Sequence, residues 1–322
     1  MQFPDGKRFA FTILDDTDDA TLENVRPVYD RLKELGFRTT KTVWPMDCPE
    51  GSRIYFAADT LQRQDYLAHV RSLVEAGFEL GSHGATMESS LRERTQHGLA
   101  FLQSEFGFLP RVHANHGQNR ENIYWGLERF QSPLIRPLIS MVGHYSRGQF
   151  AGESEDSPHY WGDLCREHFD YVRNFTFSGL DMLECNPEMP YRVASTPKVG
   201  HWFSTTDAPN VNVFLDVVNR AALERLESAG GVCIISTHLG KGFVQDGKLN
   251  STVDDTLSYL ADRPGWYVPV STLLDHLRDA HGAPTLSRAA LFRLELRYLV
   301  DQLRVRLKKT VDAHKAPTEL GT

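Results

Sequence analysis

The sequence has few cysteines and no long apolar run, and each shortage bears on the class of protein. The four cysteines lie far apart and form no Cys-x-x-Cys pair: Cys48, Cys165, Cys185 and Cys233. A disulfide framework or a zinc ribbon is therefore not expected, and a reducing compartment fits. The first residues lack the regions of a secretory signal, and no stretch has the apolar length of a transmembrane segment. We therefore expect a cytoplasmic protein.

Basic residues are fewer than acidic residues in this chain. The chain has 35 lysines and arginines against 42 aspartates and glutamates, a formal net charge of −7. Proteins that bind duplex nucleic acid carry a basic surface, so a nucleic-acid partner is not expected. The 322 residues, 41% hydrophobic and 24% charged, have the composition of one large globular domain or of a domain with an appendage.

What the sequence does have, over its first 115 residues, is a regular alternation of predicted strands and helices. Apolar runs give the strands, and apolar residues at helical spacing give the helices. In chain order these segments are 9–14, 21–35, 37–44, 65–76, 78–83, 89–106 and 109–115. The alternation predicts an α/β fold with a parallel sheet, either open or closed as a barrel.

The alternation stops at residues 118–206, where Gly, Pro, aromatic and polar residues replace long amphipathic helices. Long segments without regular structure are rare unless they are functional, so we expect an elaborate insertion that forms part of the substrate pocket. Residues 211–217 are predicted as a strand, and the apolar run at 232–238 as another.

The composition changes again after Pro284. Residues 287–309 form one helical pattern rich in Leu and Arg, and a polar tail follows. We therefore divide the chain into a domain at 1–283 and a C-terminal amphipathic helix with its tail at 284–322. The helix is expected to pack or to form a homo-oligomer, and contact with a membrane surface is the alternative.

Four predicted strands end in aspartate or histidine. Their ends are Asp15-Asp16, His83, the segment from His113 to His116, and His238. The carboxyl ends of parallel strands lie on one face of a sheet or barrel, so these side chains should converge. Adjacent carboxylates stay ionised only beside a cation or strong donors. Carboxylate oxygen and imidazole nitrogen together are the usual ligands of catalytic zinc or a similar divalent ion.

Two further aspartates, Asp18 and Asp19, come after Thr17, close to the end of the first predicted strand. Asp18 and Asp19 either cap the helix that begins near Ala20 or take part in the same site.

This arrangement resembles the polysaccharide deacetylases of the NodB-homology type, carbohydrate esterase family 4, over roughly residues 8 to 280. The resemblance implies a distorted (β/α) barrel. Ile13-Leu-Asp-Asp-Thr17 stands where that family has Thr-Phe-Asp-Asp-Gly, which implies that Asp15 is the general base and Asp16 a metal ligand. Glu79-Leu-Gly-Ser-His83 matches the start of the second motif and implies that His83 is a ligand.

The second and third motifs depart from the family pattern. Met87 occupies the position of the second histidine ligand. The third motif, Arg-x-Pro-Tyr/Trp-Gly, has its counterpart in His113-Ala-Asn-His-Gly117, so His116, or failing that His113, is expected to complete the metal site. Ile234-Ile-Ser-Thr-His238 resembles the last motif and implies that His238 is the general acid.

The resemblance implies a hydrolase that uses one divalent metal ion, with zinc first, to remove an acetyl group from an N-acetylated sugar. A substrate made inside the cell, a nucleotide-linked or lipid-linked glycan precursor, fits the expected compartment. The residues expected to contact it are His113, Asn115, Trp161, Asp163 and Arg173. For those in the insertion, packing within loops is the alternative.

Two other functions stay open from the sequence. The loss of a ligand at Met87 favours a catalytically inactive protein that binds glycans or acts as a scaffold in polysaccharide biosynthesis. The third hypothesis is a metal amidohydrolase on an (α/β) barrel that acts on an amide other than a sugar.

Overall fold

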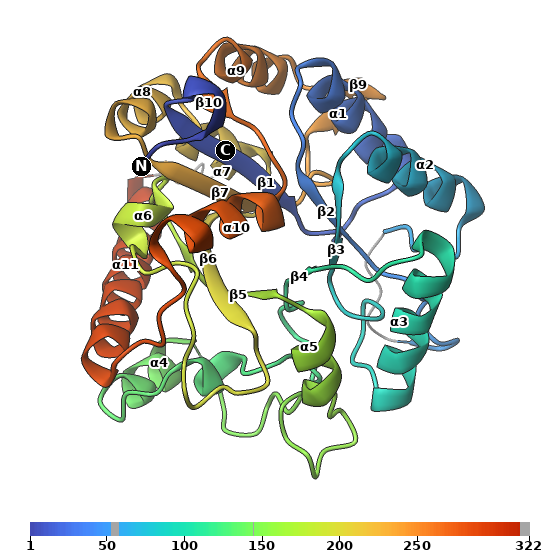
Figure 1. Ribbon diagram of the computed structural model, residues 1–322, viewed down its shortest axis with the longest axis vertical. Helices are drawn as coiled ribbons and strands as arrows, with labels where there is room; N and C mark the ends of the chain where they lie inside the picture. Colours follow the sequence, from blue (N-terminus) through green and yellow to red (C-terminus); the bar gives the residue numbers. More distant parts are fainter. Residues whose placement is uncertain (53–57, 144, 316–322) are drawn as a thin grey trace, which may run out of the picture.

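The computed structural model describes residues 1–52, 58–143 and 145–315. Its centre is a parallel barrel of seven strands, shown in Figure 1. The strands are β1 (Phe9–Asp15), β2 (Thr40–Val43), β3 (Glu79–Ser82), β4 (Val112–His113), β5 (Tyr171–Phe177), β6 (His201–Ala208) and β7 (Val232–Thr237). They pair in chain order, and β7 closes the barrel by pairing with β1 from Ala10↔Val232 to Asp15↔Thr237. The predicted (β/α) barrel is confirmed.

Helices surround these strands (Figure 1). Before and within the barrel they are η1 (Pro4–Gly6), α1 (Leu22–Glu34), α2 (Gln64–Glu75), α3 (Arg92–Phe106), η2 (Gly126–Arg129), α4 (Ile135–Gly143), α5 (Gly162–His168), α6 (Met182–Cys185), α7 (Val211–Val217) and α8 (Arg220–Ala229). After the barrel come the hairpin β8 (Val244–Gln245) and β9 (Lys248–Leu249), then α9 (Ser251–Ala261), β10 (Gly265–Trp266), α10 (Val270–His281) and α11 (Arg288–Lys315). β10 extends the sheet beside the start of β1.

The region predicted as an insertion supplies two strands of the barrel itself. β5 lies within 118–206, and β6 begins there and continues to Ala208; α6 and an irregular segment join the two strands. Arg173 and Asn174 interrupt the apolar pattern of β5. Because of this interruption, the hydrophobic pattern of the sequence does not predict this buried strand. The predicted strand at 211–217 is instead α7, because the Asn210 side chain caps a helix by accepting from the backbone N–H groups of Asn212 and Val213. The division of the chain at 283 stays a prediction.

The C-terminal helix α11 packs along β5 and α4. Leu291, Leu294 and Tyr298 are buried on its inner side. The buried Glu295 carboxylate accepts hydrogen bonds from the backbone N–H groups of Gln131, at 2.6 Å, and Ser132, at 3.0 Å. These contacts fix the helix against the segment that precedes α4.

The outer face of α11 exposes large apolar side chains, namely Phe292, Leu296, Val300, Leu303 and Leu307. The contact predicted for this face, with a second copy or a membrane surface, stays a prediction. Within the described residues, no helix is both long and apolar enough to cross a bilayer. The end of the predicted tail, residues 316–322, lies outside the described residues.

Successive side chains of β1 face opposite sides of the barrel wall, as in any strand. Phe9, Phe11 and Ile13 pack in the cluster that includes the apolar face of α1, whereas Ala10 and Leu14 belong to the other core cluster. Asp15 is the next alternate residue after Phe9, Phe11 and Ile13, so it lies on the same side of β1 and faces the helices.

A buried ion pair holds Asp15 there. Lys41, its neighbour in register on β2, places Nζ 2.9 Å from Oδ2, and both side chains are at most 1% exposed. The Tyr29 hydroxyl of α1 donates to Oδ2 at 2.8 Å, and the Leu239 N–H donates to Oδ1 at 2.9 Å. Burial together with Asp15 raises the pKa of Tyr29 well above its ordinary value, so the phenol remains a donor.

Replacing the buried cation should destabilise the protein strongly. Lys41→Met leaves the Asp15 carboxylate buried without its counter-ion, and we expect the free energy of unfolding to fall by about 3–5 kcal/mol. Urea denaturation measures this. Arg71→Met is the matched control, because it removes an exposed ion pair with Glu105 and should cost less than about 1 kcal/mol. Equal losses in the two variants would contradict a structural role for the Lys41–Asp15 pair.

Candidate metal centre

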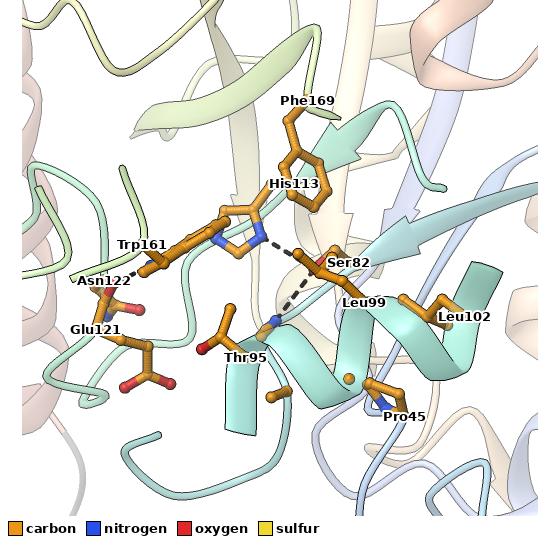
Figure 2. Close-up of a pocket in the computed structure, with 13 residues that line it drawn as sticks. Pro45, Ser82, Thr95, Leu99, Leu102, His113, Glu121, Asn122, Trp161 and Phe169 are labelled. Carbon is orange, nitrogen blue, oxygen red and sulfur yellow. Dashed lines mark hydrogen bonds between the residues drawn. The ribbon is translucent and has the colours of Figure 1, made fainter. Parts of the chain in front are cut away.

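Two cavities lie near the ends of the barrel strands. The smaller one lies beside His113 and Trp161 (Figure 2). Its volume of about 20 Å³ has room for a water molecule and not for a sugar. The His113 ring contacts Ser82 Oγ at 3.1 Å and Asn115 Oδ1 at 3.3 Å, and it packs edge-on to Trp161 with 5.0 Å between ring centroids. Burial lowers the pKa of His113 to about 3, so the ring is neutral. These contacts make His113 part of the core.

Two of the residues expected to bind substrate also lie outside the larger cavity. Trp161 is 3% exposed, and its indole N–H donates to the carbonyl of Glu121 at 2.6 Å. The Asp163 carboxylate binds the Arg92 guanidinium through two contacts of 2.7 Å. Both side chains stabilise loops, which is the alternative that the sequence left open.

The larger cavity, about 280 Å³, opens at the carboxyl ends of the barrel strands. Six of its polar side chains come from or directly follow β1, β3, β4, β5 and β7: Asp16, Asp18, His83, His116, Arg173 and His238. Asn115 also lines it, and its side chain is fixed by both the N–H and the carbonyl of Ile123. The predicted convergence of strand ends therefore holds for most of the residues concerned, but Asp15 faces the helices and does not line this cavity.

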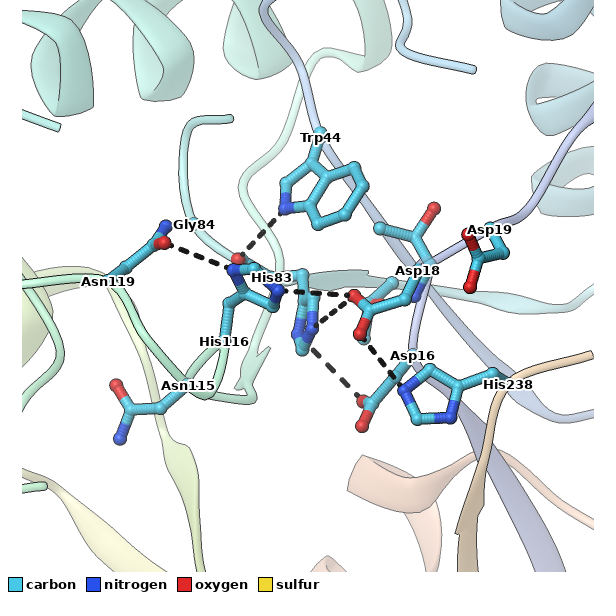
Figure 3. Close-up of polar contacts among 12 residues, drawn as sticks. Asp16, Asp18, Asp19, Trp44, His83, Gly84, Asn115, His116, Asn119 and His238 are labelled. Atoms are coloured by element: carbon cyan, nitrogen blue, oxygen red, sulfur yellow. Dashed lines mark hydrogen bonds and ion pairs between the residues drawn. The ribbon is translucent and has the colours of Figure 1, made fainter. Parts of the chain in front are cut away.

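Asp18, His83 and His116 form a compact group of buried ligand atoms, and Figure 3 shows them facing one another. One ligand atom from each residue lies within 4.8 Å of the others. Asp18 Oδ1 is 3.3 Å from His83 Nε2 and 3.6 Å from His116 Nε2. One carboxylate and two imidazoles around an open side are the protein ligands of many catalytic metal sites, so this group can hold a divalent ion.

Three observations fit a cation at this position. Asp18 Oδ1 is buried and makes no hydrogen bond of acceptable geometry with any described residue. Although burial opposes the charged form, contacts with His238 and His83 hold the pKa of Asp18 well below its ordinary value, so the carboxylate is ionised. Burial and the nearby His83 lower the pKa of His116, which favours the neutral imidazole that metals bind.

The His116 ring is also oriented from behind. Its Nδ1 lies 3.1 Å from Asn119 Oδ1, which leaves Nε2 directed toward Asp18. Such outer contacts fix the ring orientation of metal-binding histidines. Met87, which stands at the lost ligand position, is buried with Trp44 and Ala58 and does not line the cavity.

Asp16, the ligand implied by the family motif, lies beside this group and outside it. The Arg173 guanidinium binds Asp16 Oδ2 at 2.6 Å, and Asp16 Oδ1 is 3.9 Å from His83 Nδ1. Burial raises the pKa of this carboxyl, but the charges of Arg173, His83 and His238 together more than offset that effect, so the pKa is lowered. The cavity thus contains a second ionised carboxylate, whose Oδ1 makes no hydrogen bond with a described residue.

His238 lies on the other side of Asp18 (Figure 3). Its Nδ1 is 2.8 Å from the carbonyl of Pro209, and its Nε2 is 3.1 Å from Asp18 Oδ2. A carbonyl can only accept, so Nδ1 carries a proton. Burial lowers the pKa of His238, but the hydrogen bond with Asp18 and the charges of Asp16 and Asp18 together raise it more, so the net shift is upward.

Several cavity residues escaped the sequence analysis. The sequence did not decide whether Asp18 caps the first helix or belongs to the site. In the structure Thr21 is the N-cap of α1, so neither Asp18 nor Asp19 caps this helix. Aromatic and basic side chains that belong to no motif form one wall of the cavity, namely Trp125, Arg129, Tyr145 and Tyr298. Tyr298 comes from α11, more than 280 residues along the chain from Asp16, and no local pattern could place it there.

Comparison with known proteins finds similarity in structure only. No protein-family model and no curated protein matches the sequence. A protein from Mycobacterium smegmatis assigned as a polysaccharide deacetylase superposes with a TM-score of 0.53 at 15% identity, covering 89% of this chain and 96% of that one. Another from Pseudomonas aeruginosa PAO1, assigned likewise, gives 0.50 at 12% identity over 87% and 94%.

Puue allantoinase gives a TM-score of 0.51 at 12% identity and covers 87% of this chain and 93% of its own. At such low identities the likeness concerns the fold and not the activity. The chain therefore has the fold of the polysaccharide deacetylases over most of its length, as its strand-end motifs imply.

Proposed function

We propose that the protein is a metal-dependent hydrolase that removes an acetyl group from an N-acetylated sugar or glycan precursor. The observation that carries this proposal is the buried group of Asp18, His83 and His116 inside a cavity that also contains an ionised Asp16 and an imidazole at His238. The deacetylase-like fold supports the same reading.

Asp18, His83 and His116 would hold the metal ion, with His116 in place of the ligand lost at Met87. This set differs from the one implied by the motif, since Asp18 replaces Asp16. The mixed oxygen and nitrogen donors suit zinc. Once bound, the ion would polarise the acetyl carbonyl and lower the pKa of a water molecule.

Asp16 is the better candidate for the general base than Asp15. It is ionised, it lines the cavity, and its contact with Arg173 fixes the orientation of the carboxylate. Arg173 would thus be a positioning residue and not a direct contact to the sugar. In the proposed reaction, Asp16 accepts a proton from the water molecule as the water oxygen bonds to the acetyl carbon.

His238 would complete the reaction as the general acid. Its Nε2 faces the cavity beside Asp18, and Pro209 holds the opposite ring nitrogen. When the bond between the acetyl carbon and the amide nitrogen breaks, His238 donates a proton to the leaving nitrogen. The products are acetate and a free amine.

A second candidate substrate is a small amide that is not a sugar. Two observations favour it: the similarity in fold to an allantoinase, and a cavity volume at the low end of the range for ligand sites. Hydrolysis assays that compare N-acetylhexosamines with simple amides and allantoin distinguish the two. An inactive scaffold would hydrolyse none of them.

Metal content tests the ligand set. After incubation with zinc, we expect about one ion per chain by elemental mass spectrometry, and loss of that ion in Asp18→Asn. Asp19→Asn is the matched control, because the adjacent Asp19 pairs with Lys241 outside the group. An equal metal content in both variants would contradict the role of Asp18.

The replacement of the lost ligand is tested in the same way. His116→Ala removes a proposed ligand atom and should lower zinc affinity by about 100-fold or more, whereas Met87→Ala should change it little. Competition with a chelating dye measures both. Small and equal effects would refute the idea that His116 replaces the missing ligand.

The base is tested by Asp16→Asn, which keeps the size of the side chain and removes its ability to accept a proton. We expect kcat to fall by about 10²–10⁴-fold while zinc content is retained. Asp163→Asn should leave kcat close to wild type, because Asp163 binds Arg92 away from the cavity. Loss of zinc in Asp16→Asn would instead make Asp16 a ligand, as the family motif implies.

A further inference from the structure

One wall of the cavity contains a buried arginine without a counter-ion. Arg129, at the end of η2, lines the cavity and is only 7% exposed. Among the described residues, no carboxylate lies within ion-pair distance of its guanidinium. The other arginine of the cavity, Arg173, already has a counter-ion, because its Nη1 lies 2.6 Å from Asp16 Oδ2.

The Arg129 guanidinium is nevertheless held in a fixed orientation. Nε donates to Asn174 Oδ1 at 3.2 Å, and Nη2 donates to the Asn174 carbonyl at 2.5 Å. Three aromatic rings surround the group: its central carbon is 4.2 Å from the Trp125 centroid, 5.1 Å from that of Phe175 and 5.3 Å from that of Tyr298. Nη1 makes no hydrogen bond with any described residue.

This arrangement favours an anion as the missing partner. Removing a guanidinium from water is costly unless opposite charge or acceptors replace the lost hydration. The aromatic faces and a neutral amide recover part of that cost, but they leave the positive charge uncompensated. A planar, oriented guanidinium with a free N–H is well suited to phosphate or carboxylate oxygens.

We propose that Arg129 forms a subsite for an anionic group on the substrate. This inference rests on the proposed function, because it places the subsite in the cavity that contains the proposed hydrolytic residues. It narrows the substrate class to N-acetylated compounds that also carry a phosphate or a carboxylate. Trp125 and Tyr298 position the guanidinium for this contact.

Binding measurements with three probes test the subsite. Isothermal titration calorimetry on the zinc-incubated protein compares N-acetylglucosamine 1-phosphate, N-acetylmuramic acid and neutral N-acetylglucosamine. We expect at least one anionic probe to bind about tenfold or more tightly than the neutral one, as one charge-assisted hydrogen bond would give. The tighter of the two anionic probes identifies phosphate or carboxylate as the recognised group.

Variants assign the preference to Arg129. Arg129→Gln should bind all three probes equally, and Arg129→Lys should keep part of the preference because it keeps the charge. Arg225→Gln, which removes an exposed arginine on α8, is the matched control for net charge and should behave as wild type. A preference that survives in Arg129→Gln would overturn the proposal.

Wild-type protein alone also decides the matter if the variants fail to fold. Equal affinity for the three probes, or no binding of either anionic probe, would overturn the subsite. Hydrolysis and metal content report separately on the proposed function. An anion preference that depends on Arg129 without hydrolysis of any probe would therefore support the subsite and refute the deacetylase.

Discussion

Two adjacent carboxylates at the end of a strand cannot face the same side of a barrel wall, and the candidate site depends on that constraint. Asp15 faces the helices, where Lys41 and Tyr29 compensate its charge. Asp16 consequently faces the cavity, and two residues later the chain brings Asp18 there as well. The strand end thus supplies one carboxylate to the structure and two to the cavity.

The charges in the cavity are balanced across strands that are distant in sequence. Arg173 of β5 reaches Asp16, and His238 after β7 reaches Asp18. Both contacts require a closed barrel, because β7 stands beside β1 only through the pairing that completes the ring. Closure of the barrel therefore brings the parts of the site together, and buried networks of this kind fix side chains that would otherwise move.

Much of the site could be predicted from the sequence because parallel strand ends converge by geometry. That rule placed His83, His116 and His238 together. It could not choose between Asp15 and Asp16, although the large side chains at Phe9, Phe11 and Ile13 mark the helix-facing set of β1. The sequence did not indicate that His113 and Trp161 lie buried outside the larger cavity, because burial depends on tertiary packing. The polar residues inside β5 also hid a barrel strand.

The helix α11 has a consequence for what counts as the smallest functional unit. A division of the chain by composition falls at residue 283, and all seven barrel strands lie before it. Tyr298 lies after it, yet its ring closes one wall of the cavity and stacks on the Arg129 guanidinium. A fragment that ends at the compositional boundary would contain all seven barrel strands but lack Tyr298 and the buried side chains of α11, so the barrel and the helix form a single working part.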